Sequence, residues 1–220
     1  MLRVYKFRDT EIRVEICRDV YDPSDDTFLI LENATPHGSV LEVGSGSGII
    51  SVFFALLGFS ATAVDINPEA VKCTLHNADL NGVSINATTG NLFDGVGMFD
   101  TVIFNPPYLP TDDDFGGSEQ WNGGSDGFMV TRPFLRELPS HLKRDGECFL
   151  ILSSLTDIGS IMGEFQDLKF TEVAKSAFPF EKLYLYSVKQ KDFKNVVDLY
   201  AKLKRSYAGA PINVTIRREY

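Results

Sequence analysis

Hydrophobic runs alternate with amphipathic segments along most of the chain, and the runs end in glycine or polar residues. The run at 40–43 breaks into a turn with glycine at every second position, and an apolar segment follows at 49–57. This order predicts a buried strand, a tight turn and a packed helix. The same reasoning places further strands at 61–65, 83–88, 99–104, 146–153, 170–177 and 182–188, and helices at 25–31, 68–81, 128–142 and 158–165.

The alternation of strands and helices predicts an α/β domain built on a parallel sheet. Ahead of it, alternating apolar and polar positions at 2–7 and 11–17 predict a β-hairpin. After it, residues 192–207 have one apolar helical face and 211–217 is typical of a strand. The sequence has no internal repeat and no linker. We therefore expect one domain over 1–220, with the hairpin at 1–20, a core at 21–190 and a C-terminal extension at 191–220.

Composition and charge narrow the class of protein. The chain has 220 residues, of which 44% are hydrophobic, and its formal net charge is −9. These values predict a globular protein and disfavour an extended nucleic-acid surface, which needs clustered Lys and Arg. Residues 182–220 nevertheless hold nine Lys and Arg against three acidic residues. This basic stretch is either a solvated helix face or a contact with an acidic partner or nucleic acid.

No apolar run approaches the roughly 20 residues that span a bilayer, and the first residues lack the apolar core of a signal peptide. We therefore expect a cytoplasmic protein that does not enter a membrane. Cys17, Cys73 and Cys148 are odd in number, widely separated and without a histidine at ligand spacing. We accordingly expect three buried thiols, with no disulfide framework and no metal site.

Acidic and polar residues stand where successive predicted strands end. Glu42 precedes a Gly-x-Gly-x-Gly turn, whereas a dinucleotide-binding turn has Gly-x-Gly-x-x-Gly. A carboxylate there repels phosphate and suits an amine-bearing ligand. Asp65 ends the next strand, where an acid can bind both ribose hydroxyls, and Asn91 follows the strand after that. These residues point to S-adenosylmethionine, although each turn alone is also typical of a plain connection between elements.

The strand at 99–104 ends in Asn105-Pro106-Pro107-Tyr108. The Asn105 side-chain oxygen and the Pro106 carbonyl can each accept a hydrogen bond from one substrate NH₂ group. Two prolines hold these acceptors in place, and Tyr108 can pack over a planar amide or aromatic amine. A proline turn leaving a central strand would explain the motif without function. Its position beside Glu42 and Asp65 favours methyl transfer to nitrogen.

The residues at these strand ends resemble the motifs of a known protein family. The motifs resemble those of class I S-adenosylmethionine-dependent methyltransferases with Asn-Pro-Pro-Tyr, most closely the HemK-related glutamine methyltransferases of release factors. Tyr21-x-Pro23-x-x-Asp26-Thr27 is similar to the N-terminal signature of the archaeal and eukaryotic branch, and Trp121-x-Gly123-Gly124-x-x-Gly127 to its loop after the motif. The resemblance covers about residues 11–189.

The resemblance implies a Rossmann-like class I methyltransferase fold with a mainly parallel seven-stranded sheet and helices on both faces. It implies a catalytic set of Asn105, Pro106, Pro107 and Tyr108. It implies cofactor contacts from Tyr21, Thr27, Glu42, Gly44, Gly46, Gly48, Asp65, Ile66, Asn91, Leu92 and Asn105. Asn91 departs from the aspartate usual in the family, although an amide can still hydrogen-bond to the adenine amine.

The resemblance also implies a function and partners. The expected reaction is N5-methylation of the glutamine in the Gly-Gly-Gln loop of a class I release factor. The alternatives are an adenine-N6 or guanine-N2 methyltransferase acting on DNA or RNA, and a non-catalytic binding protein of the same fold. A small zinc-binding activator is expected to dock by strand addition near Ile85, on the predicted edge strand 83–88. That edge could instead be solvated, or be covered by residues 212–216.

Overall fold

The computed structural model describes residues 1–111 and 121–191, and residues 1–190 form one compact unit. The helix and strand expected within 192–217 and the middle of the loop at 111–127 lie outside the described residues. The strands are β1 Leu2–Phe7, β2 Thr10–Glu15, β3 Ser39–Val43, β4 Ser60–Asp65, β5 Asn86–Thr89, β6 Phe99–Phe104, β7 Leu142–Ser153, β8 Leu168–Ala177 and β9 Lys182–Gln190. The helices are α1 Asp25–Asn33, α2 Ile49–Leu56, α3 Pro68–Leu80, α4 Thr131–His141 and α5 Ile158–Glu164.

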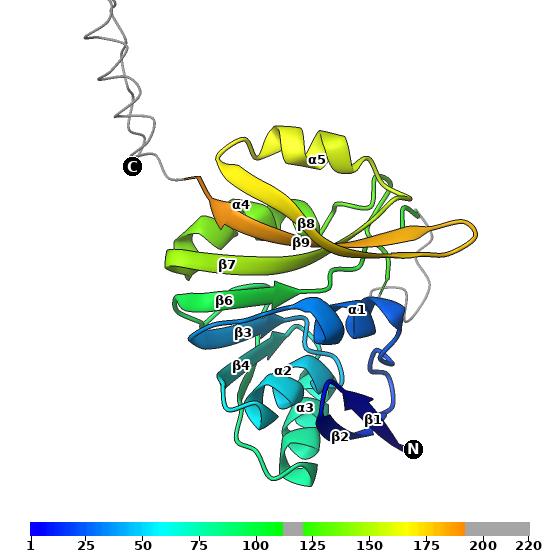
Figure 1. Cartoon of the computed structure of the whole chain (residues 1–220), viewed down its shortest axis with the longest axis vertical. Helices are drawn as coiled ribbons and strands as arrows, with labels where there is room; N and C mark the ends of the chain where they lie inside the picture. The colour runs from blue at the N-terminus through cyan, green and yellow to red at the C-terminus, as the bar shows by residue number, and fades with distance from the viewer. Residues whose placement is uncertain (112–120, 192–220) are drawn as a thin grey trace, which may run out of the picture. The chain divides into compact units, whose positions relative to one another are not determined.

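Seven of these strands form one sheet in the order β5-β4-β3-β6-β7-β9-β8 (Figure 1). The strands from β5 to β7 are parallel, whereas β9 runs antiparallel to both β7 and β8. The order reverses between β3 and β6, and in open α/β sheets a ligand crevice forms at such a switch point. The predicted mainly parallel seven-stranded sheet and the separate N-terminal hairpin are confirmed.

Both faces of the sheet are buried. Neighbouring residues of a strand point to opposite faces, so successive residues of β3 pack into different hydrophobic clusters. Val40 of β3 packs into one hydrophobic cluster with Phe53 of α2, whereas Leu41 packs into the other with Phe134 of α4. All four side chains are fully buried. The near-continuous apolar sequence of β3 follows directly from this two-sided burial.

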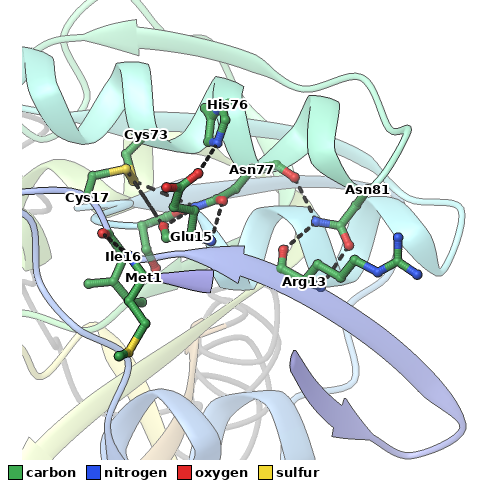
Figure 2. Close-up of polar contacts among 10 residues, drawn as sticks. Met1, Arg13, Glu15, Ile16, Cys17, Cys73, His76, Asn77 and Asn81 are labelled. Carbon is green, nitrogen blue, oxygen red and sulfur yellow. Dashed lines mark hydrogen bonds and ion pairs between the residues drawn. A yellow bond between two sulfur atoms is a disulfide. The ribbon is translucent and has the colours of Figure 1, made fainter. Parts of the chain in front are cut away.

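The β1–β2 hairpin is fastened to α3 by polar contacts (Figure 2). The side-chain oxygen of Asn77 accepts a bond from the Glu15 backbone N–H at 2.8 Å, and its NH₂ group donates to the Glu15 carbonyl at 3.1 Å. Asn81 makes the same pair of bonds with the backbone of Arg13, at 2.9 and 2.6 Å. Two asparagines one helical turn apart therefore pair with β2 as another strand would.

The expectation of three free thiols is wrong, because Cys17 and Cys73 form a disulfide. Cys17 follows β2 and Cys73 lies on α3, and the contacts of the hairpin with α3 bring the two sulfur atoms together (Figure 2). The residues are 56 apart in sequence and make no recognisable spacing, so their pairing depends on this tertiary packing. Cys148 is a buried free thiol, as expected.

Some predicted bounds are also wrong. The edge strand β5 begins at Asn86, and Ile85, expected on an exposed edge, is 8% exposed and packs into the core. Ser24 is the N-cap of α1, but its side chain makes no capping hydrogen bond. The helix expected from residue 128 begins at Thr131. Among the described helices, none is long and apolar enough to cross a membrane.

Candidate active site

The predicted site residues gather at the carboxyl ends of the parallel strands β3, β4, β5 and β6. A cavity of about 1310 Å³ opens there. All but one of the predicted residues line it: Tyr21, Thr27, Glu42, Gly44, Gly46, Asp65, Ile66, Asn91, Leu92, Asn105, Pro106, Pro107 and Tyr108. The cavity lies at the switch point of the sheet, where an α/β fold binds its ligand.

The glycine turn brings backbone close to this cavity. Gly44 and Gly46 have φ angles of 67° and 53°, in the left-handed region that favours glycine. Gly48 does not line the cavity. A Cβ atom on it would lie 2.7 Å from atoms of Thr74, so this glycine permits close packing of the start of α2 on α3.

Glu42 is 2% exposed, and it accepts hydrogen bonds from the Ser51 backbone N–H, at 2.8 Å, and from the Ser51 hydroxyl. Burial raises the pKa of its carboxyl group to about 8, although the Ser51 bonds act in the opposite direction. No cation pairs with it among the described residues. A ligand ammonium group placed in the cavity would therefore favour the charged form of Glu42.

Asp65 organises the turn as well as facing the cavity. Its two carboxylate oxygens accept from the backbone N–H groups of Gly46 and Asn67, each at 2.8 Å. Burial raises the pKa of Asp65. Each oxygen has a further lone pair, so the carboxylate can still accept from ribose hydroxyls.

Asn91 is exposed, and its backbone N–H donates to Asp94 at 3.1 Å. Leu92 has a φ of 51°, which is unusual for a residue with a branched side chain. The turn after β5 thus places both residues on the cavity wall. This position fits a flat ring lying between polar and apolar side chains.

Asn105 follows β6, and the environment of its side-chain oxygen is unusual. Its side-chain oxygen is buried and has no hydrogen-bond partner among the described residues. Leaving a buried acceptor unpaired costs about 1–3 kcal/mol, so such an atom requires an explanation. The explanation offered by its place on the cavity wall is a ligand N–H donor.

The role of the Asp26 side chain was missed from the sequence, where Asp26 appears only as part of the signature Tyr21-x-Pro23-x-x-Asp26-Thr27. The Asp26 carboxylate is 4% exposed and accepts from the Tyr21 hydroxyl at 2.8 Å and the Tyr108 hydroxyl at 3.3 Å. Its other oxygen accepts from the Thr27 backbone N–H and hydroxyl at 2.5 and 3.1 Å. Burial, with Asp26 as the largest nearby charge, raises the pKa of both tyrosines. Asp26 therefore links the glycine-turn side of the cavity to the Asn105 side.

Two arrangements thus meet in one cavity: an acidic, glycine-rich half that suits a nucleoside bearing an amine, and a half with fixed acceptors for an NH₂ group. This fold and this site define a class I methyltransferase. The Methyltransferase small domain family matches residues 17–178. The chain belongs to this family, in its HemK-like branch, and it is a methyltransferase.

Individual relatives agree with this assignment. A putative protein N5-glutamine methyltransferase of Methanocaldococcus jannaschii is 39% identical over 182 residues, covering 78% of this chain and 92% of the relative. The eRF1 methyltransferase catalytic subunit mtq2 of Schizosaccharomyces pombe is 30% identical over 186 residues, covering 69% and 80%. The solved Mtq2–Trm112 complex of E. cuniculi shares the fold, with a TM-score of 0.61, 20% identity, and coverage of 79% of this chain and 99% of that one.

Proposed function

We propose that the chain uses S-adenosylmethionine to methylate the N5 atom of a glutamine side chain in the Gly-Gly-Gln loop of a class I release factor. The observation that carries this proposal is the unpaired, buried Asn105 oxygen at the wall of the cavity. Among the relatives, the names protein N5-glutamine methyltransferase and eRF1 methyltransferase support a protein glutamine as acceptor.

The cavity residues fit the proposed cofactor. Glu42 can pair with an ammonium group, Asp65 can accept from ribose hydroxyls, and the turn at Asn91 can flank an adenine ring. When bound, the cofactor supplies a methyl group activated on a sulfonium. In the ligand-free protein the buried Glu42 carboxyl has no counter-ion among the described residues, and this ammonium would supply one.

The chain's own part in the reaction is to orient the acceptor nitrogen. The Asn105 oxygen and the Pro106 carbonyl accept the two hydrogens of the amide NH₂, which turns the nitrogen toward the cofactor side of the cavity. Tyr108 packs along the planar amide, and the Tyr108 hydroxyl is held in place by its bond to Asp26. The described lining contains neither His nor Cys. This is compatible with methyl transfer to the amide nitrogen in which the leaving group would be a neutral thioether and the nitrogen's surplus proton would pass to water afterwards.

The same acceptor pair would also suit an aromatic amine, so nucleic acid is the comparison to make. Cofactor with a labelled methyl group should be incubated with the protein and, separately, a class I release factor, an RNA and a DNA. The proposal expects label on the release factor alone. Label on either nucleic acid with none on the release factor would contradict it.

We further propose that a small zinc-binding partner pairs with the outer edge of β5, which is the last strand of the sheet on this side among the described residues. The E. cuniculi Mtq2–Trm112 complex supports a protein partner for a chain of this fold. The Gly90 N–H donates to Asp65 of β4, so alternation along β5 points the Thr89 N–H away from β4. No strand of the described part of the chain pairs with these outward backbone groups, which suits them to strand addition.

Thr89→Pro removes one outward donor without removing a bond to β4. If strand addition occurs, this variant should lose co-purification with a Trm112-type partner. Thr89→Val, which keeps the N–H, is the matched control and should bind normally. Equal binding by both variants would contradict docking at this edge.

A further inference from the structure

The turn between β8 and β9 exposes an uninterrupted apolar stretch, Ala177-Phe178-Pro179-Phe180, which we call the aromatic turn. Phe180 is 93% exposed and Phe178 is 37% exposed. The turn is closed by a 2.7 Å bond from the Phe178 N–H to the Glu181 carbonyl. Four consecutive exposed apolar residues are unfavourable for a soluble surface unless they contact a partner.

The aromatic turn lies at the carboxyl ends of the parallel strands, where the active site also lies. Leu183 of β9 pairs with Ser153 at the carboxyl end of β7, and the turn immediately precedes this pair. In Figure 1 the turn extends outward at the right of the view, beyond the end of the sheet. It therefore projects from the side of the molecule on which the parallel strands open into the cavity.

A second, smaller hollow joins the aromatic turn to the Asn-Pro-Pro-Tyr motif. This hollow, of about 160 Å³, is lined by Phe178 and Glu181 from the turn and by Asp26 and Tyr108 from the active site. Tyr21 and Tyr108 line both the hollow and the large cavity. A chain whose glutamine reaches Asn105 would thus have neighbouring residues beside the hollow and the turn.

The hollow is strongly acidic. Asp25, Asp26 and Glu181 line it, and no Lys or Arg is among its lining residues. Besides burial, these three carboxylates raise the pKa of Tyr108. Their combined field would stabilise a cation next to the acceptor site. The same field would repel the phosphates of a nucleic acid.

We propose that the aromatic turn and the acidic hollow dock the polypeptide segment flanking the methylated glutamine, and that this segment carries a Lys or Arg that enters the hollow. The inference rests on the proposed function, because it assigns a binding surface to the same substrate. Phe178 and Phe180 supply the apolar anchor typical of interface hot spots, and Pro179 limits the freedom that the turn would lose on binding.

The test is direct binding, measured by fluorescence anisotropy with the full chain and S-adenosylhomocysteine. One labelled peptide carries a central glutamine flanked by Arg and Lys, and a second has serine in place of these cations. The basic peptide should bind about tenfold more tightly, and more weakly as salt increases. Phe180→Ser should weaken its binding about tenfold, the loss typical of truncating an interface aromatic. Glu181→Gln should reduce the difference between the two peptides.

Met98→Ser is the matched control. Met98 is 52% exposed, but it lies at the amino end of β6, opposite the carboxyl ends that open into the cavity. It should bind both peptides as the wild type does. Equal binding of the two peptides, or unchanged binding by Phe180→Ser, would overturn the docking surface. Tighter binding of a single-stranded RNA than of the basic peptide would also overturn it. Methylation of the peptide glutamine is scored separately, because its failure bears on the proposed function.

Discussion

At the scale of single residues, Asp26 shows how one buried carboxylate connects two parts of the cavity wall. It holds the hydroxyl of Tyr108 on the acceptor side and that of Tyr21 near the glycine turn. Hydrogen bonds to a charged group contribute about 1.5–3 kcal/mol each. The sequence shows Asp26 only as an acid near the start of a helix, and only the fold reveals that its side chain is buried and accepts from the hydroxyls of Tyr21 and Tyr108.

Asp26→Asn and Tyr108→Phe should each raise the KM of the acceptor by about tenfold, because either change weakens the same contact. The double variant should be little worse than the more damaging single one, since the residues act together. Steady-state kinetics on the three variants measures this. Tyr21→Phe is the comparison, and it should affect cofactor affinity more than acceptor KM. Strictly additive losses for Asp26 and Tyr108 would show that they act independently.

The raised pKa of Glu42 predicts that stability and cofactor binding depend on pH. Folding raises its carboxyl pKa from 4.5 to about 8. Its contribution to the stability of the ligand-free protein is therefore fully present below pH 4.5 and is lost as the pH rises through 8. Near pH 7, binding of a cofactor ammonium should lower this pKa and release up to one proton.

Calorimetric titration with S-adenosylmethionine at pH 7, in buffers of different ionisation enthalpy, measures that release. The observed enthalpy should depend on the buffer for the wild type and lose this dependence in Glu42→Gln. A wild-type enthalpy that is the same in every buffer would contradict a cofactor-linked titration of Glu42.

At the scale of elements, the contact of β2 with α3 combines a disulfide with the Asn77 and Asn81 backbone pairs. A covalent link between residues 56 apart restricts the unfolded chain and should stabilise the fold by about 4 kcal/mol. Cys17→Ser should lower the free energy of unfolding by about this amount in guanidinium titrations. A reductant should affect the wild type in the same direction and leave the variant unchanged. If the free energies of unfolding of the wild type and Cys17→Ser differ by well below about 1 kcal/mol, a stabilising role for the disulfide is contradicted.

Much of the fold could be predicted, because strands buried on two faces have distinct apolar runs and their ends carry the polar site residues. The run at Val40 to Val43, the glycine turn and the strand before Asn105 are clear for this reason. The disulfide, the inward-facing Ile85 and the packing role of Gly48 were missed because each depends on a distant element. Local pattern contains no information about which helix will lie against a given turn.

At the scale of the whole molecule, charge and surface shape favour a polypeptide substrate. Residues 1–181 carry 27 acidic against 12 basic residues, and the acidic hollow adjoins the acceptor side of the cavity. The basic residues gathered from 182 onward lie mostly outside the described part of the chain. The described surface therefore offers a basic protein segment more complementarity than it offers a nucleic acid.

The central claim is that Asn105 orients a glutamine amide for methylation. The most direct measurement compares the wild type with Asn105→Ala in methyl transfer to a purified class I release factor, with the modified atom mapped by mass spectrometry and cofactor affinity measured in parallel. We predict N5-methylglutamine in the Gly-Gly-Gln loop, a rate lower by about 10²–10³ for Asn105→Ala, and nearly unchanged cofactor affinity. Methylation of a different residue, or a variant rate within a few-fold of wild type, would contradict the account.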